Sequence, residues 1–319
     1  MRPIMLLAAI LCVLVAHPAR ALERIIIGTV GAPSGGQWPY LIGMKKGFFA
    51  AAGLELDIIY VPSAPGLIQQ LVAGSLEAVA TSGLVEPILA SEKGAPIAII
   101  RIIGQVPPYA LIARPGIASL KDLKGKTISL GGLTDITRVY FDRMMEPNGL
   151  KIGDYDIVVA GATGARFVAL KSGAVDAAIL LPPLSFQAES EGFKTVGMAV
   201  DYVHDVPFTG AMVNTIWATQ RKQTVAALLQ AVNRSTEWFY DPAHRDESIA
   251  IMAQAVGVGR QEAEMTYDFF RKIELFERSG KVSRAQLQKL IDIQLQLGLL
   301  GERLSPDRVV LAGVTELTD

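Results

Sequence analysis

Hydrophobic residues along the chain form short continuous runs that alternate with stretches of helical spacing, and this alternation predicts an α/β fold. Residues 24–29 are a β-branched run, the pattern of a strand buried on both faces. A glycine-rich turn, residues 31–36, separates this run from a helical pattern that begins around Trp38 and extends to Gly47 or Ala52. The pattern then predicts strands at 56–61 and 97–103 and helices at 66–73 and 85–92.

The same order of elements returns in the middle of the chain. A stiff segment, residues 104–109, contains Pro107-Pro108 and interrupts the pattern. After it come a short strand and a helical turn that begins at Ser119 with a capping-box pattern. The remaining predictions are strands at 126–130, 156–160 and 193–199, helices at 136–145 and 163–172, and a second glycine-led turn at 131–135.

A short repeated motif links the two halves. Residues 71–78 contain a leucine, then Gly74, then Glu77 followed by alanine, and residues 170–177 repeat this spacing with Gly173 and Asp176. Glycine suits the left-handed position just past a helix, and the apolar runs that follow fit short buried strands. We therefore predict corresponding corners of two similar lobes, with the divergent residues after each corner facing a shared cleft.

The last third of the chain is predicted to return to the first lobe. Residues 201–208 are irregular like the first connector, residues 209–218 resemble a strand, and helices are predicted at 223–241, 246–256, 261–272 and 283–297. We expect the first lobe to comprise residues 22–105 and 206–319, and the second lobe residues 106–205.

Residues 1–21 have the pattern of a cleaved secretory signal peptide. Arg2 precedes an apolar run of 13 residues, and Ala19-Arg20-Ala21 is a small-x-small cleavage signal. A lipoprotein signal is the alternative, because Cys12 lies in this segment, but Leu11 stands where a lipobox needs a small residue. We expect an exported protein, periplasmic if the cell has two membranes.

Composition limits the chemistry of the exported chain. Cys12 is the only cysteine, so its removal excludes disulfides, thiolate nucleophiles and cysteine metal clusters. Loss of Arg2 and Arg20 leaves 28 basic residues against 31 acidic ones, which does not favour a nucleic-acid partner. His204 and His244 are far apart in sequence, and we expect neither a metal nor a cofactor.

Several motifs together resemble a known family. They are Gly28-Thr-Val to Trp38-Pro39, Gly47-Phe-Phe to Gly53-Leu54, Leu71 to Ala78, Ser119 to Lys126, Ala169 to Ala177, and Pro182-Pro183. With these motifs, residues 24 to about 236 resemble the type II periplasmic solute-binding proteins of ABC importers, in the subgroup for nitrate, sulfonate, taurine and thiamine-pyrimidine uptake. The resemblance implies two α/β lobes, each a mostly parallel sheet flanked by helices, a two-strand hinge, and a solute held between the lobes.

Candidate solute contacts follow the turns and connectors of both lobes. Hydroxyl groups and helix amides suit an anion, whereas aromatic side chains can stack on a planar ring. In the first lobe the candidates are Ser34, Gln37, Trp38, Thr81, Ser82 and Tyr109. In the second lobe and on the return they are Leu133, Thr134, Thr137, Pro182, His204 and Phe208.

Simpler structural roles compete with several of these assignments. Ser34 also fits a helix cap, and Trp38 also fits packing within its lobe. Arg138, the one cation noted close to these candidates, also fits a solvated helix position.

The sequence predicts a binding protein, not an enzyme. Gly125-Lys126-Thr127 lacks the first glycine of a P-loop, and Ser34 lies one position off the spacing of a nucleophile elbow. We expect a monomer that captures a small organic anion or planar heterocycle and delivers it to an ABC permease in the inner membrane. A protein that senses solute for a membrane receptor and an exported enzyme on the same fold are the alternatives.

Overall fold

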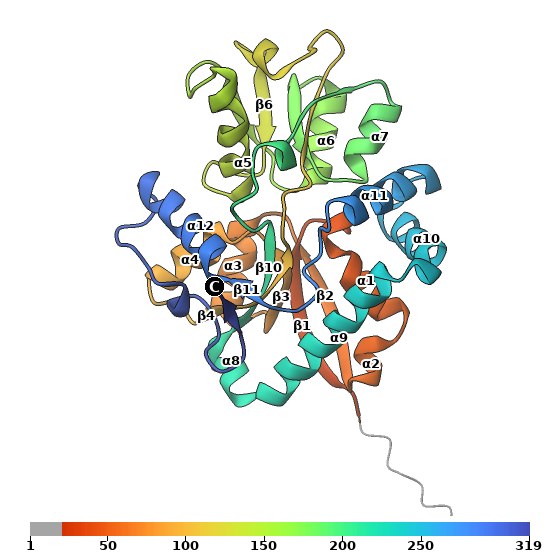
Figure 1. The fold of residues 1–319 in the computed structure, drawn as a ribbon, viewed down its shortest axis with the longest axis vertical. Helices are drawn as coiled ribbons and strands as arrows, with labels where there is room; N and C mark the ends of the chain where they lie inside the picture. Colours follow the sequence, from red (N-terminus) through yellow and green to blue (C-terminus); the bar gives the residue numbers. More distant parts are fainter. Residues whose placement is uncertain (1–20) are drawn as a thin grey trace, which may run out of the picture.

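The computed structural model describes residues 21–319 (Figure 1). The expected signal peptide therefore lies outside the described residues, apart from Ala21. Within residues 21–319, no helix is long and apolar enough to cross a membrane.

The first lobe is built on a five-stranded mixed sheet. β1 pairs in parallel with β2 on one side and β3 on the other, whereas β10 runs antiparallel to both β3 and β4. The strands lie in the order β2 (Leu54–Val61), β1 (Glu23–Val30), β3 (Ala78–Ser82), β10 (Thr209–Asn214) and β4 (Ile97–Gly104).

The second lobe repeats this topology. β6 pairs in parallel with β7 and β8, and β5 runs antiparallel to β8 and β9. Its strand order is β7 (Asp156–Val159), β6 (Thr127–Leu130), β8 (Ala177–Leu180), β5 (Ala110–Ala113) and β9 (Lys194–Met198). The predicted two-lobed α/β fold is confirmed. β5 follows the connector at residues 104–109, β10 follows the connector at residues 201–208, and the two strands occupy equivalent positions in their sheets. The division at residues 105 and 206 stays a prediction.

Helices flank both sheets (Figure 1). Those interspersed with the first four strands are α1 (Trp38–Lys45), α2 (Phe48–Ala51), α3 (Ala64–Val72) and α4 (Val85–Glu92). Those of the second lobe are α5 (Ile136–Met145), α6 (Thr163–Ser172) and α7 (Leu184–Ser190). The C-terminal part contains α8 (Thr215–Gln220), α9 (Lys222–Tyr240), α10 (Arg245–Val256), α11 (Arg260–Lys272) and α12 (Arg284–Gln296).

Shorter elements complete the secondary structure. The 3-10 helices are Gly35–Gln37, Leu120–Leu123, Glu146–Asn148, Ala199–Asp201, Pro242–His244 and Pro306–Arg308. A two-stranded sheet joins β11 (Val282–Ser283) to β12 (Leu317–Thr318).

The repeated corners have the same structure in both lobes. Gly74 and Gly173 both adopt the left-handed conformation, with φ of 76° and 77°. The Glu77 carboxylate accepts a hydrogen bond from the amide of Ile26 at 2.8 Å, and the Asp176 carboxylate accepts one from the amide of Thr127 at 2.9 Å. Each acidic side chain therefore fixes the corner to the neighbouring parallel strand of its own lobe.

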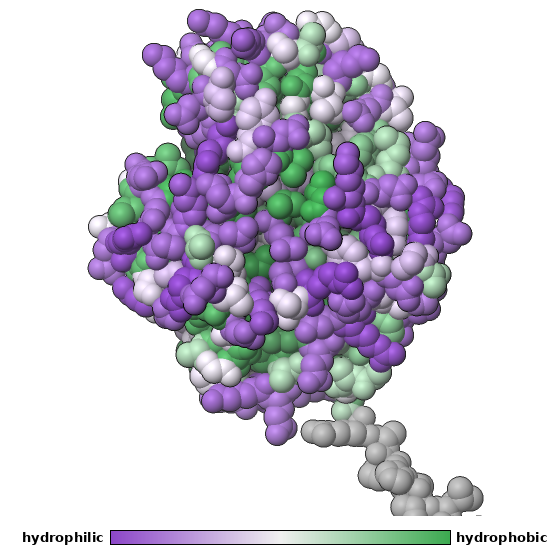
Figure 2. All heavy atoms as spheres, viewed as in Figure 1, coloured by the Kyte–Doolittle hydropathy of each residue, from purple (hydrophilic) through white to green (hydrophobic). Residues whose placement is uncertain are grey.

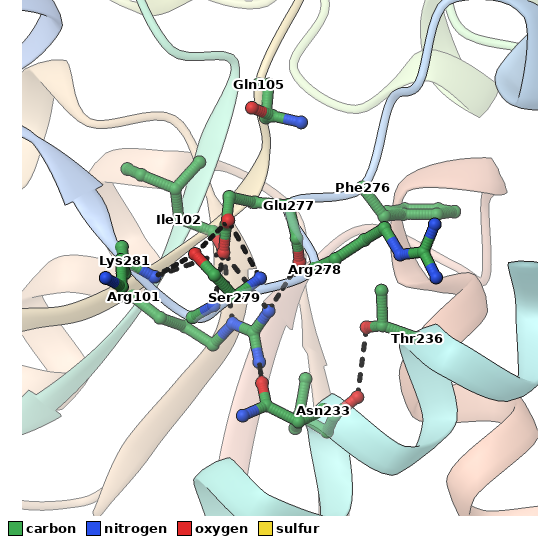
Figure 3. Close-up of polar contacts among 12 residues, drawn as sticks. Arg101, Ile102, Gln105, Asn233, Thr236, Phe276, Glu277, Arg278, Ser279 and Lys281 are labelled. Atoms are coloured by element: carbon green, nitrogen blue, oxygen red, sulfur yellow. Dashed lines mark hydrogen bonds and ion pairs between the residues drawn. The ribbon is translucent and has the colours of Figure 1, made fainter.

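Three of the C-terminal helices contact helices of the first lobe. α9 and α10 contact α1, and α12 contacts α4. Arg101 of β4 is buried and joins the first sheet to α9 and to the segment that contains Glu277 (Figure 3). Its guanidinium donates to the side-chain oxygen of Asn233 in α9 and, at 2.7 Å, to the backbone carbonyl of Glu277.

Three local predictions differ from the structure. The predicted strand 209–218 stops at Asn214, because the Asn214 side chain accepts hydrogen bonds from the amides of Ile216 and Trp217 and caps α8. Left-handed Gly47 divides the first predicted helix into α1 and α2. α7, which follows the Pro182-Pro183 pair, is absent from the elements that the sequence predicts.

Candidate ligand-binding site

A cavity lies between the two lobes, at the carboxyl ends of their parallel strands. Its volume is ≈ 250 Å³, and both sheets supply lining residues where β1, β3, β6 and β8 end or have just ended. Val30 and Ser82 come from the first lobe, and Gly131 and Leu181 from the second. This edge of an open α/β sheet is where ligands bind in such folds. Figure 2 shows hydrophobic residues where the two lobes meet on the displayed face.

Glu86, in the first turn of α4, lines the cavity and has an unusual environment. Glu86 is only 8% exposed, and neither of its carboxylate oxygens accepts a hydrogen bond from another described residue. Burial, and secondarily the negative charge of Asp135, raise the pKa of Glu86 to about 8. A buried ionised carboxylate without a partner is costly, so this group holds its proton near neutral pH.

The second lobe places an acidic and a basic side chain on the opposite wall. Asp135 caps α5 by accepting hydrogen bonds from the amides of Thr137 and Arg138, at 3.0 and 3.2 Å. Burial raises the pKa of Asp135, and the hydrogen bond from the Thr137 hydroxyl, at 2.6 Å, acts in the opposite direction. Asp135 is therefore held by its own lobe.

Arg166 of α6 is buried and held by neutral acceptors. Its Nε donates to the carbonyl of Ile179 at 2.6 Å, its Nη2 donates to the Thr163 hydroxyl at 2.8 Å, and its Nη1 donates to the carbonyl of Gly161. A guanidinium has five N–H donors, so two remain beyond these three bonds. Arg166 and Asp135 both line the cavity, and their charges attract each other.

The ring of Tyr109 forms part of the cavity wall. Tyr109, 7% exposed, lines it, and the Arg166 guanidinium lies 5.7 Å from the centre of the Tyr109 ring. Phe208 packs edge-on against Tyr109 with ring centres 5.5 Å apart. Burial raises the pKa of Tyr109 to about 12, so its phenol stays protonated at neutral pH.

Four of the predicted contact residues line the cavity. They are Ser34, Ser82, Tyr109 and Thr137. The Ser82 hydroxyl is buried without a hydrogen-bond partner among the described residues, which leaves it free for a solute. The Thr137 hydroxyl instead binds Asp135 and the amide of Gly131, and so shapes the second glycine turn. Ser34 makes no side-chain capping bond, although a helix cap was the alternative role considered for it.

The structure places Trp38 in the core of the first lobe, away from the cavity lining. Its side chain is fully buried, its indole N–H donates to the carbonyl of Ser248 at 3.0 Å, and it packs against the rings of Phe239, Tyr267 and Phe270. The packing role considered for Trp38 accounts for this environment, so Trp38 does not enter the proposed site.

The other predicted contacts also lie outside the cavity lining. Gln37 is buried and donates to the Thr29 hydroxyl at 2.9 Å, and Thr81 is buried in β3. Leu133, Thr134 and His204 are exposed, whereas Phe208 stands behind Tyr109. Pro182 offers its carbonyl to the amide of Gly35 at 3.2 Å and so joins the two lobes.

Sequence reasoning missed the charged residues of the cavity. Glu86 and Arg166 are not among the candidates that the sequence predicts, and Asp135 enters that prediction only as part of the second glycine-led turn. An acidic residue in the first turn of an apolar helix that follows a buried strand is a usable signal for Glu86. Nothing local marks Arg166, because its burial depends on the carbonyls of Gly161 and Ile179. Among the described residues, no group of three or more metal-ligating side chains occurs.

Known structures share this two-lobed architecture. The alkanesulfonate-binding protein SsuA from Xanthomonas axonopodis pv. citri, bound to MOPS, is 17% identical with a TM-score of 0.74, over 92% of this chain and 98% of that one. The periplasmic nitrate-binding protein NrtA from Synechocystis PCC 6803 is 16% identical with a TM-score of 0.71, over 88% and 83%. A cysteine-to-serine mutant of DszB, in complex with biphenyl-2-sulfinic acid, is 18% identical with a TM-score of 0.65, over 91% and 97%.

These likenesses define the class of fold, that of the periplasmic binding proteins. The model of the family described as NMT1/THI5 like matches residues 37–244, more than half of the chain. The protein therefore belongs to the NMT1/THI5-like family, in agreement with the sequence resemblance. None of the curated proteins compared with the chain matches it.

Proposed function

We propose that this protein is an extracytoplasmic solute-binding protein that encloses a small organic solute between its lobes and delivers it to an ABC permease. The observation that carries the proposal is a cavity bounded by both lobes, with a buried Glu86 on its wall that has no partner among the described residues. Family membership and the resemblance to SsuA and NrtA support the same function. The exported location and the permease partner are parts of this proposal.

Contacts between the lobes support a mechanism of closure around solute. The amide of Gly35 donates to the carbonyl of Pro182, and the rings of Phe186 and Phe269 pack edge-on with centres 6.1 Å apart. A solute that touches both walls favours the conformation in which these contacts form, because it interacts with the two walls together only there.

The site chemistry narrows the solute expected from the sequence, a small organic anion or a planar heterocycle. Glu86 and Asp135 are both acidic, and the buried cation that lines the cavity, Arg166, is already held by three acceptors. A further negative charge is therefore poorly accommodated. Of the two solute classes, these walls favour the uncharged or basic heterocycle.

The function can be tested before the solute is identified. The purified protein is incubated with a small-molecule extract of its host, dialysed and examined by native mass spectrometry, and its thermal unfolding is compared with and without the extract. We expect one retained solute and a raised unfolding temperature, because a ligand that binds only the folded state stabilises it. Chemical conversion of the retained solute would instead support the enzyme alternative.

Delivery to a permease needs a separate measurement. Uptake of the identified solute is compared between cells with and without the gene. Loss of uptake supports transport, whereas unchanged uptake together with a lost cellular response to the solute supports a sensing role.

A further inference from the structure

Glu86 is the one cavity side chain whose charge has no partner among the described residues. Asp135 accepts three hydrogen bonds within the second lobe and lies within the field of Arg166. Arg166 and Asp135 therefore balance each other. The Glu86 carboxylate, once ionised, leaves the cavity with one uncompensated negative charge.

Charged side chains on the elements around Glu86 are engaged elsewhere. α3 carries no charged residue. On β4, Arg101 donates hydrogen bonds to Asn233 and Glu277. On α12, each charged side chain has an oppositely charged neighbour: Arg284 pairs with Asp307, Lys289 with Asp205, and Asp292 with Arg303. On its own helix, the Glu92 carboxylate accepts from the amides of Gly301 and Glu302. Across the cavity, Asp135 and the phenol of Tyr109 face the same space. No cation of the described residues serves Glu86.

We propose that the solute of this protein is a small organic cation, whose protonated nitrogen pairs with the Glu86 carboxylate. A cationic nitrogen with N–H donors supplies the opposite charge and the hydrogen bonds that both Glu86 oxygens lack. The Ser82 hydroxyl, also buried and lining the same cavity, provides a further acceptor. The inference rests on the proposed solute-binding function.

An anion meets the opposite situation. With Glu86 ionised, an anionic solute adds a second uncompensated negative charge to a buried space. With Glu86 protonated, the anion still faces Asp135, while most strong donors of Arg166 point to protein carbonyls and a hydroxyl. The charge distribution of this cavity therefore selects against the kind of solute named for SsuA and NrtA.

Binding of such a cation is coupled to loss of a proton. Burial keeps the Glu86 carboxyl protonated in the empty cavity, with a pKa of about 8. A solute that needs the carboxylate must therefore displace the proton below that pH. Its affinity rises with pH, about tenfold for each pH unit well below the pKa, and levels off above it.

Two charge-matched pairs of probes test the proposal: benzamidine and butylamine as cations, and benzenesulfonate and butanesulfonate as anions. Calorimetric titration of the whole protein measures affinity across the pH range below and above 8. We expect cation binding that strengthens with pH in the wild type. In Glu86→Gln we expect at least about tenfold weaker cation binding without this pH dependence. Glu55→Gln, which alters an exposed carboxylate of β2, serves as the matched control and leaves both properties unchanged.

The outcomes separate this inference from the proposed function. Failure of both cations to bind at millimolar concentration, or cation affinity that is the same in Glu86→Gln, overturns the inference. Sulfonate binding with unchanged affinity in Glu86→Gln also overturns it but leaves the solute-binding function in place. If native mass spectrometry shows that the solute retained from the host extract is an anion, the inference is likewise overturned and the solute-binding function stands. Failure of any solute to be retained counts instead against the proposed function itself.

Discussion

Gly83 of the first lobe lies directly against Ile136 of the second, across the cleft. A Cβ atom at position 83 would be 2.8 Å from Cγ2 of Ile136, which is shorter than real contacts of this kind. Because no other described side chain lies near that position, the absence of a side chain at Gly83 is what allows the lobes to approach this closely.

We predict that Gly83→Ala opens the cleft. The added methyl group clashes only across the lobes, and overpacking of this kind typically costs about 1–3 kcal/mol. The closed form is destabilised by that amount, so solute affinity falls by about 5- to 150-fold, while the free energy of unfolding changes little. Small-angle X-ray scattering and titration with retained solute measure the two effects.

A second substitution identifies the contact. Ile136→Ala added to Gly83→Ala is expected to restore compactness, because it removes the clashing side chain. Gly36→Ala is the matched control, since a Cβ there meets only the Phe208 ring at 3.7 Å, an ordinary contact distance. Unchanged scattering in Gly83→Ala would show that the lobes do not approach this closely in solution.

The two repeated corners are predicted to matter for stability and not for binding. Glu77→Ala removes the acceptor for the amide of Ile26, and Asp176→Ala removes the acceptor for the amide of Thr127. Each substitution should lower the free energy of unfolding by roughly 1.5–3 kcal/mol, the usual range for a hydrogen bond to a charged group. Chemical denaturation measures this loss. Glu55→Ala, exposed on β2, should change little, and equal losses in all three variants would contradict the assigned role.

Trp38→Ala distinguishes core packing from solute contact. The substitution removes a fully buried ring that packs against Phe239, Tyr267 and Phe270, so we expect a loss of about 3–5 kcal/mol in the free energy of unfolding. Solute affinity of the folded fraction should stay within error of the wild type. Trp217→Ala on α8, where the side chain is partly exposed, is the control and should cost less. An affinity loss of about 1 kcal/mol or more would restore the stacking role expected from the sequence.

The sequence predicted the repeated scaffold because its signals are local. Gly74 and Gly173 each end a helix, and the acidic residues three positions later return at the same spacing, so the two lobes could be recognised before their contacts were known. The end of β10 was missed, because β-branched residues continued the apolar pattern while the Asn214 side chain started a helix.

The site was harder to predict, because burial is a property of the assembled lobes. Trp38 follows a glycine turn and has the composition of a solute contact, yet C-terminal residues cover it completely. Glu86 reads as an ordinary acidic residue in the first turn of a helix. The packing of α4 buries Glu86, and this burial, together with the charge of Asp135, which is distant in sequence, raises its pKa.

The unpartnered Glu86 also predicts how stability depends on pH. The pKa of Glu86 is raised from 4.5 to about 8 in the folded protein, so between these values the folded state keeps a proton that the unfolded chain has released. The contribution of Glu86 to the free energy of unfolding is therefore fully present below pH 4.5 and is lost as the pH rises toward 8. Each unit of pKa shift corresponds to about 1.36 kcal/mol, so the total loss is on the order of 4–5 kcal/mol.

Glu86→Gln removes this dependence, since an amide does not ionise. Denaturant unfolding of the solute-free protein, just above pH 4.5 and again above pH 8, should show the wild type losing more stability than Glu86→Gln over this interval. The comparison cancels the other titrating groups, and Glu55→Gln should follow the wild type. Parallel pH profiles for the wild type and Glu86→Gln would mean that water reaches the Glu86 carboxylate in the empty cavity. The ion pair between Glu86 and the solute would then contribute less to solute affinity than the burial of Glu86 indicates.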